Sequence, residues 1–145
     1  MLRNCERLLR FTLLCIVAAL VAHGRAIADE TRRAEISAAI AYDFGNVAGA
    51  AALWRQAAEA GSRDAMVSLG GIHETGEIGR RDLPTAVDWY RQAAALGDAL
   101  AMFRIAELTD REPSLTAEPS HEWLRRAAAA GHPVARERIA ATGTK

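Results

Sequence analysis

The densest group of side chains that could do chemistry in this sequence is His73, Glu74 and Glu77. An imidazole next to carboxylates could transfer protons in acid–base catalysis or help to bind a metal ion. A zinc-protease helix carries two histidines four positions apart, however, and position 77 holds a glutamate. The sequence therefore predicts no metal site here. An enzyme that acts on peptides or glycans of the cell envelope through these three residues is kept as an alternative.

No other pattern of residues points to catalysis or to a cofactor. The glycines between Gly70 and Gly79 lack the lysine and the following serine or threonine of a phosphate-binding loop. The sequence has no G-x-S-x-G motif of a serine hydrolase, and Glu118 and Glu122 lie four positions apart, where both would face solvent on one helix face. We predict no catalytic residue, no metal ligand and no cofactor-binding residue.

The balance of charges argues against nucleic-acid binding. The chain has 145 residues, of which 18 are basic and 18 acidic, whereas a nucleic-acid-binding surface has an excess of basic residues on one face. The arginine pairs at 32–33, 80–81 and 125–126 alternate with acids and are expected to be solvated. Half of the residues are hydrophobic, which fits one compact domain.

The segment from Met1 to Ala28 has the three parts of a secretory signal peptide. Arginines at positions 3, 7 and 10 precede an uncharged apolar run at residues 11–22, and Ala26, Ile27 and Ala28 form a cleavage site of the small-x-small type. This run is shorter than the about 20 residues of a membrane-spanning helix. We predict cleavage after Ala28, export to the periplasm or out of the cell, and no stable membrane insertion after cleavage.

Cleavage would change the chemistry of the remaining chain. Both cysteines, Cys5 and Cys15, would leave with the signal peptide, so the mature chain from Asp29 would contain no disulfide bond. Its net charge would be close to −3, with 14 basic and 17 acidic residues. Packing alone must then stabilise the domain, and a chain of this length buries enough surface to fold without cross-links.

A segment of nine residues occurs three times in the rest of the chain. The copies are LWRQAAEAG at 53–61, WYRQAAALG at 89–97 and WLRRAAAAG at 123–131, so their final glycines stand at positions 61, 97 and 131. A spacing in the mid-thirties is typical of a solenoid of helix pairs. Each copy is expected to be the second helix of a pair, ended by a left-handed glycine, and to place one aromatic residue in the core: Trp54, Tyr90 and Trp123.

The first helix of each pair is predicted from apolar residues at steps of three and four. These helices are expected at residues 30–44, 64–75 and 98–109, and a last helix at 132–141 caps the stack. Asp82 is expected to cap the helix that contains Pro84. The predicted fold is all-α, an α-solenoid of about three antiparallel helix pairs plus a C-terminal capping helix. The pairs lie at 30–61, 62–97 and 98–131 within one domain, residues 29–145.

The segment at residues 63–97 resembles the Sel1-like repeat, a relative of the tetratricopeptide repeat. The residues that fall on the family pattern are Ala65, Leu69, Gly70, Gly76, Asp82, Ala86, Trp89, Tyr90, Ala93, Ala94 and Gly97. The resemblance covers about residues 41–141 and implies a right-handed solenoid that serves as an interaction scaffold, commonly in the periplasm. His73 stands where the family usually has tyrosine, which favours a packing role for this histidine.

One face of the predicted first helices mixes apolar residues with acids and is expected to line a concave groove. Val67, Leu100 and Phe103 could anchor a peptide while the carboxylates select basic or amide-rich flanks. The alternative for Phe103 is burial under the terminal helices. The predicted groove residues are Asp64, Val67, Gly71, Glu74, Leu100, Phe103, Glu107 and Asp110.

The leading functional hypothesis is an exported, non-enzymatic adaptor that binds a protein or peptide partner in this groove and is a monomer without it. Regular repeats provide a large preformed surface, which suits binding rather than bond-making. Besides the enzyme, a second alternative is a building block that assembles with other solenoids through its incomplete ends. Neither nucleic acid nor a cofactor is expected as a ligand.

Overall fold

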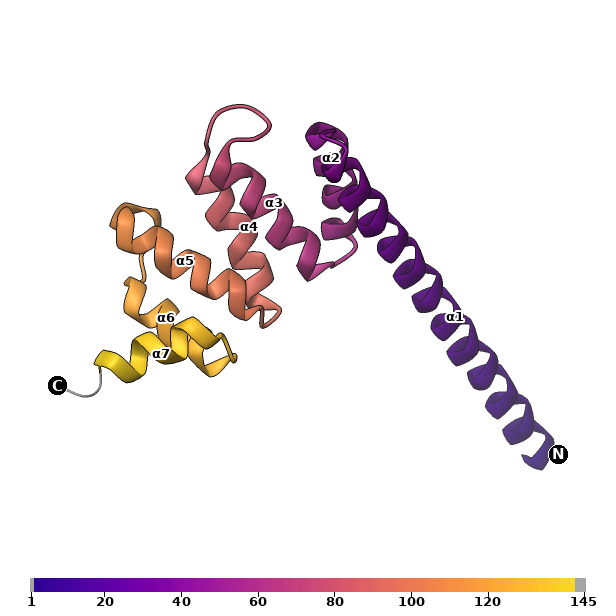
Figure 1. The fold of residues 1–145 in the computed structure, drawn as a ribbon. Coiled ribbons are helices and arrows are strands. Elements are labelled where there is room, and N and C mark those ends of the chain that lie inside the picture. The colour runs from indigo at the N-terminus through magenta and orange to yellow at the C-terminus, as the bar shows by residue number, and fades with distance from the viewer. Residues whose placement is uncertain (1, 143–145) are drawn as a thin grey trace.

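The computed structural model describes the backbone of residues 2–142 and the side chains of residues 16–142. In this part of the chain seven α-helices and one short 3-10 helix follow one another without a strand (Figure 1). The all-α prediction is therefore confirmed. The helices are α1 (Leu2–Asp43), α2 (Val47–Glu59), α3 (Arg63–Thr75), α4 (Leu83–Ala95), α5 (Ala99–Arg111), the 3-10 helix η1 (Pro113–Leu115), α6 (Ser120–Ala129) and α7 (Pro133–Thr142).

Consecutive helices pack against each other in a linear series. The pairs are α1 with α2, α3 with α4, and α5 with α6, and further contacts of α2 with α3 and of α4 with α5 join the pairs. α7 packs on α6 and closes the series (Figure 1). The helices after α1 begin and end close to the expected positions. Each pair therefore buries its apolar residues against its neighbours, as a repeat fold requires.

α1 starts earlier than the predicted helix at residues 30–44. It runs without a break from Leu2, because the sequence up to Asp43 contains no proline and is rich in alanine and leucine, which favour helix. All side chains at residues 16–30 are exposed, and the first buried one is Ala34. The packed body thus begins after the predicted cleavage site, and Figure 1 shows the N-terminal part of α1 extending away from it. Removal of residues 1–28 stays a prediction.

Over the residues that the structure describes, no helix combines the length and the apolar character needed to span a membrane.

The three repeated segments end as predicted at left-handed glycines. The backbone angle φ is +90° at Gly61, +85° at Gly97 and +104° at Gly131, a conformation that glycine adopts without strain. Each glycine turns the chain directly into the next helix. Side-chain oxygens then cap the N-termini of four helices, including the predicted cap at position 82: Asn46, Ser62, Asp82 and Asp98.

Small side chains let the helices approach closely. Ala57, Ala93 and Ala127 take the same position in the three repeats, and all three are fully buried. Leu69 and Ile105, which hold equivalent positions in the first helices α3 and α5, are fully buried as well. Large residues from one helix thus pack onto shallow surfaces of the next.

A glycine is required where α3 meets α4. A Cβ atom at Gly70 would lie 2.5 Å from Cε1 of the Tyr90 ring. Tyr90 is only 2% exposed, so that its ring has little room to move aside. The prediction that Tyr90 is a core residue is confirmed, and the same holds for Trp123.

We predict that Gly70→Ala destabilises the protein by about 1–3 kcal/mol, because the added methyl group overpacks the contact with Tyr90. Gly71→Ala is the matched control. Its Cβ would have only the Tyr90 hydroxyl within reach, at 3.9 Å, and alanine is better than glycine in a helix by about 0.5–1 kcal/mol. Urea denaturation followed by circular dichroism measures both variants. Equal midpoints would contradict the role of Gly70.

Candidate functional site

The predicted groove does not extend to Phe103. This side chain is 7% exposed and packs with Ala127 and Ala135. Its ring stacks on His132 with 4.1 Å between ring centroids, and the guanidinium of Arg138 lies 5.1 Å from the ring centroid. The prediction of an exposed anchor at Phe103 is therefore wrong, because residues of α6 and α7 cover it. The alternative, burial under the terminal helices, is correct.

The other predicted groove residues lie in different surroundings. Glu107 is turned toward α7, where an Arg138 nitrogen lies 3.5 Å from its carboxylate. The series of acids and apolar residues is thus interrupted where α7 meets α5. Of the remaining positions, the exposed ones are Asp64, Leu100 and Asp110. The half-buried ones are Val67 and Gly71.

Glu74, predicted both as a groove residue and as an acid–base candidate, joins three helices. The Tyr90 hydroxyl donates a hydrogen bond of 2.9 Å to one carboxylate oxygen of Glu74. Arg111 of α5 places a guanidinium nitrogen 3.7 Å from the other oxygen. Arg81 donates a hydrogen bond of 3.0 Å to the Glu74 backbone carbonyl. With 14% of its side chain exposed, Glu74 holds α3, α4 and α5 together.

The three residues of the enzyme alternative point to different surroundings. The Nε2 atom of His73 is buried and has no hydrogen-bond partner, in agreement with a packing role. Glu74 accepts the hydrogen bond of Tyr90 described above, and Glu77 accepts a hydrogen bond of 2.8 Å from Thr75. Among the residues that the structure describes, no group of three histidine, cysteine or acidic side chains could hold a metal ion.

A pocket of about 350 Å³ lies between α1, α2 and α3, and we call it the aromatic pocket. The rings of Tyr42 and Trp54 line it, with 5.5 Å between their centroids and 50° between their planes. Carboxylates and hydroxyl groups accompany the rings, so the pocket is amphipathic. The polar residues that line the pocket are Asp43, Ser68, Thr75 and Glu77, and Gly71 lines it as well.

The carboxylate of Glu77 changes the acidity of the Tyr42 hydroxyl. Hydrogen bonding to Glu77, followed by the negative charge of the same carboxylate, raises the pKa of Tyr42 above its ordinary value of 10. Thr75 donates a hydrogen bond of 2.8 Å to the same carboxylate, which lines the pocket.

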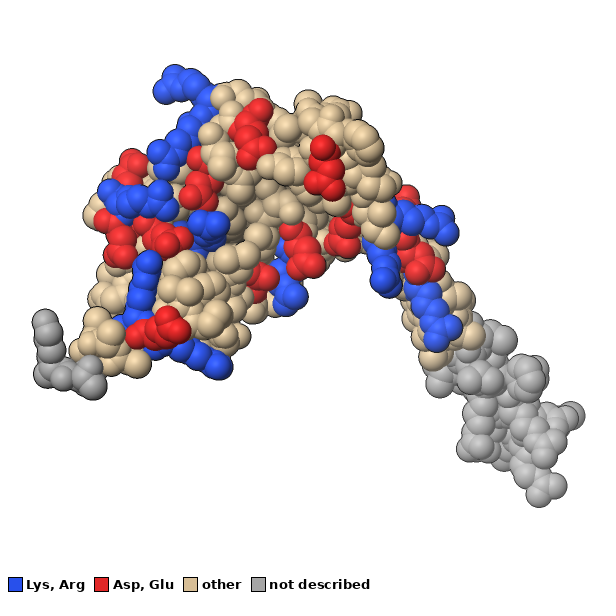
Figure 2. Space-filling model, in the orientation of Figure 1, with Lys and Arg blue, Asp and Glu red and all other residues tan. Residues whose placement is uncertain are grey.

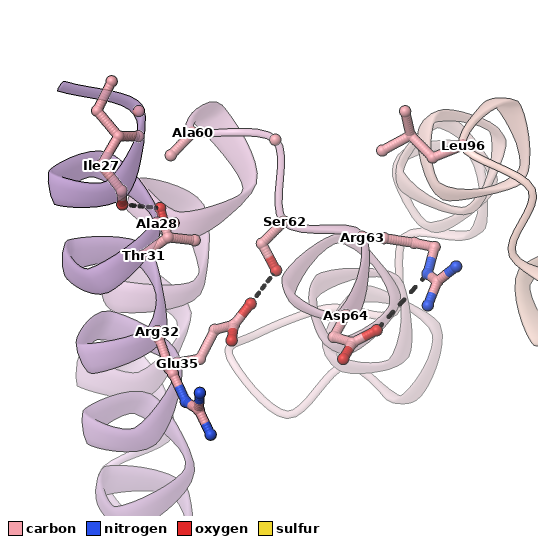
Figure 3. A pocket seen from close by; sticks show the side chains of 12 residues that line it. Ile27, Ala28, Thr31, Arg32, Glu35, Ala60, Ser62, Arg63, Asp64 and Leu96 are labelled. Carbon is pink, nitrogen blue, oxygen red and sulfur yellow. Dashed lines mark hydrogen bonds and ion pairs between the residues drawn. The ribbon is translucent and has the colours of Figure 1, made fainter. Parts of the chain in front are cut away.

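A second, larger pocket of about 650 Å³ depends on the N-terminal part of α1. Figure 3 shows Ile27 and Ala28 of α1 beside the turn from α2 to α3, with Arg63 and Leu96 on the far side. Gly24 also lines this pocket. Cleavage after Ala28 would remove part of its wall. The aromatic pocket is made only of residues from position 39 onward and does not depend on that cleavage.

Charged side chains of both signs are mixed on the face shown in Figure 2. The predicted solvation of the arginine pairs at 32–33, 80–81 and 125–126 is confirmed, since all six residues are exposed. Several arginines nevertheless bind nearby acids, for example Arg63 with Asp98 at 3.2 Å and Arg126 with Glu118 at 3.1 Å. This face therefore has no extended basic surface.

The aromatic pocket is the feature that sequence reasoning missed. Trp54 is predicted as a core residue because it shares a repeat position with the buried Tyr90, yet it is only partly buried. Its partner Tyr42 lies in the first helix of the first predicted pair and carries no motif. The signal that could have identified the pocket is the presence of a second aromatic residue, Tyr42, in the first helix of the pair whose second helix carries Trp54.

We predict that Tyr90 makes folding stability depend on alkaline pH. Burial, followed by the charge and hydrogen bond of Glu74, raises the pKa of Tyr90 well above its ordinary value of 10. In the folded state Tyr90 then keeps a proton that the unfolded chain loses. Its contribution to stability is complete below about pH 10 and falls as the pH rises above that value. Urea denaturation between pH 8 and 11 measures this loss.

Tyr90→Phe should flatten this pH dependence, since phenylalanine cannot ionise. Tyr42→Phe is the comparison. Glu77 also raises the pKa of Tyr42, but this side chain is exposed, so its substitution should flatten the pH dependence less than Tyr90→Phe does. The chain has no third tyrosine. The prediction fails if the two variants show the same dependence of the unfolding midpoint on pH.

Comparison with known proteins identifies the repeats. The family model described as Sel1 repeat matches residues 39–62, 63–98 and 117–132, which together make up just over half of the chain. The third match begins only at residue 117, after α5 and η1. No curated protein matches the chain.

A solved structure supports the same assignment at the level of the fold. A crystal structure of a Sel1 repeat protein from Oxalobacter formigenes is similar to this chain with a TM-score of 0.60 and 24% sequence identity. The similarity covers 78% of this chain and 47% of the other, so this chain spans about half the length of that protein. The repeat matches and the shared all-α repeat fold lead to one conclusion: this chain belongs to the Sel1 repeat family.

Proposed function

We propose that this chain is an exported adaptor that binds a segment of a partner protein at the aromatic pocket. Sel1 repeats are generally scaffolds for protein–protein interactions. The observation that carries the proposal is the preformed pocket between α1, α2 and α3, in which Tyr42 and Trp54 offer rigid apolar surface beside hydrogen-bonding groups. A preformed site of this kind binds with a small loss of conformational freedom.

Exposed apolar residues on α1 extend this surface beyond the pocket. Ile36 and Ile40 are 54% and 52% exposed, and they lie four residues apart on one helix face. Asp43, which lines the pocket, lies three residues after Ile40 and therefore on the same face. Phe44, directly after the end of α1, is 86% exposed. Large exposed apolar residues beside a pocket support an interaction with another polypeptide.

Export is the second part of the proposal, and it rests on the sequence from Met1 to Ala28. The described side chains from residue 16 to residue 28 are exposed, so their removal would leave the buried core intact. The absence of cysteine after Cys15 means that an oxidising compartment would not change the covalent structure of the mature chain.

We predict that the chain recovered from expressing cells begins at Asp29, because Ala26 and Ala28 provide the cleavage site. Intact-mass spectrometry would then show that the segment from Met1 to Ala28 is missing from the 15.6-kDa chain. Replacing Ala26 and Ala28 by arginine should block the cut and serves as the control. Recovery of the unmodified chain at full length would count against cleavage.

We predict that peptides selected from a phage-displayed random library bind the chain, as recovered from cells, at the aromatic pocket. Gly71→Leu should weaken these peptides at least tenfold in fluorescence polarisation, because the new side chain fills space where a Cβ meets almost nothing. Gly71→Ala, which adds one methyl group to the same helix position, is the matched control and should bind nearly as well as the unaltered chain.

Two results would contradict the adaptor function. One is that no peptide is selected, and the other is that the selected peptides bind the Gly71→Leu variant unchanged. Light scattering should show a monomer in the absence of peptide. Growth of the particle mass with concentration would instead favour the building-block alternative.

A further inference from the structure

We propose that the aromatic pocket receives the side chain of one lysine or arginine in the bound segment. The inference rests on the proposed adaptor function and names the chemistry that this pocket recognises. It concerns residues 39–77 only, so it does not depend on whether the signal peptide is removed.

Two carboxylates at the pocket have no basic ion-pair partner among the described side chains, residues 16–142. Asp43 and Glu77 both line it, and no lysine, arginine or histidine is among the lining residues. Elsewhere in the described part of the chain, acids pair with arginines, as Asp98 does with Arg63 at 3.2 Å and Glu107 with Arg138 at 3.5 Å. None of the ion pairs in that part of the chain involves Asp43 or Glu77. A basic side chain of the partner would supply the missing positive charge.

The ends of two helices add to the negative potential. α1 ends at Asp43 and α3 ends at Thr75, and both terminal residues line the pocket. The last carbonyl groups of a helix carry a partial negative charge and interact favourably with cations. The helix termini and the two carboxylates therefore favour the same sign of ligand charge.

The aromatic rings suit the rest of a long basic side chain. Lysine and arginine bury an aliphatic stem along apolar surface while their charged end stays near polar groups. A cation within about 6 Å of an aromatic ring centroid is also attracted by the face of the ring. Trp54 and Tyr42 provide such rings, and Glu77 is held beside them by its hydrogen bond with Thr75. The stem can pack on the rings while the charged group reaches the carboxylate.

Other ligands match the pocket less well. An acidic side chain would be repelled by Asp43 and Glu77. An uncharged aliphatic side chain would contact the rings but would leave both carboxylates without a counter-charge. A neutral sugar could stack on the rings with the same shortcoming. Charge complementarity thus favours a basic residue of a protein over these ligands.

The test uses small probes and nuclear magnetic resonance on the ¹⁵N-labelled chain as recovered from cells. The chain has three tryptophans, and Trp54→Phe identifies the indole signal of the pocket. N-acetyl-lysine methylamide should shift this signal and saturate with a dissociation constant in the millimolar range, as expected for a single side chain. N-acetyl-norleucine methylamide, which has the stem without the charge, should bind at least fivefold more weakly. The corresponding arginine probe should behave like the lysine probe.

A charge variant tests the role of the carboxylate. Glu77→Gln keeps the size of the side chain, and we expect it to weaken the lysine probe at least fivefold. Glu59→Gln is the matched control, since it removes the same charge from an exposed position on α2 that does not line the pocket. It should leave binding of the probe unchanged.

Several results would overturn the inference. Equal binding of the lysine and norleucine probes, or equal binding to the Glu77→Gln and Glu59→Gln variants, would show that charge is not recognised. A shift of the Trp54 signal by N,N′-diacetylchitobiose but not by lysine would assign the pocket to glycans. Tighter binding of 1-aminopentane than of N-acetyl-lysine methylamide would assign it to free amines instead of a polypeptide.

The selected peptides separate this inference from the adaptor function. If peptides without lysine or arginine bind and shift the Trp54 signal, the adaptor function stands and the basic subsite is wrong. If no peptide is selected although the lysine probe binds as expected, the adaptor function fails while the recognition of a basic group is supported.

Discussion

The close contact between Gly70 and the Tyr90 ring determines how the centre of this molecule is assembled. Because position 70 has no side chain, the ring can lie against the backbone of α3. In that position the Tyr90 hydroxyl reaches Glu74, whose carboxylate also faces Arg111 of α5. One missing methyl group thus permits a chain of contacts through three consecutive helices, and the small alanines of the other repeats serve the same kind of approach.

The same repeat position is used in two ways, and this difference creates the candidate site. Trp54 and Tyr90 each lie seven residues before the glycine that ends their helix. Tyr90 is buried against Gly70, whereas Trp54 faces the ring of Tyr42 and remains partly open to solvent. A residue type that repeats for reasons of packing therefore lines a pocket in the first helix pair of the packed body.

The helices could be predicted from the sequence because their determinants are local. The glycines at 61, 97 and 131 terminate helices through their own backbone conformation. Asp82 caps α4 by accepting a hydrogen bond from the backbone amide of Thr85, only three residues later. The site could not be predicted in the same way. Phe103 shares the pattern of an exposed helix face, and it is covered only because α6 and α7 pack against it. Tyr42 and Trp54 meet because of how α1 packs on α2, which no short pattern encodes.

Cleavage after Ala28 would change the surroundings of two acidic residues of α1. In the full chain Asp29 and Glu30 lie in the interior of a long helix, where every neighbouring amide is already bonded along the helix axis. If proteolysis exposes Asp29 as the first residue, the same two carboxylates come to stand among unbonded N–H groups and beside a new ammonium group, where negative charge is favourable. Cleavage would thus place acidic residues in the first turn of the shortened helix, where they would stabilise its N-terminus. In the uncut helix the same residues have no such effect.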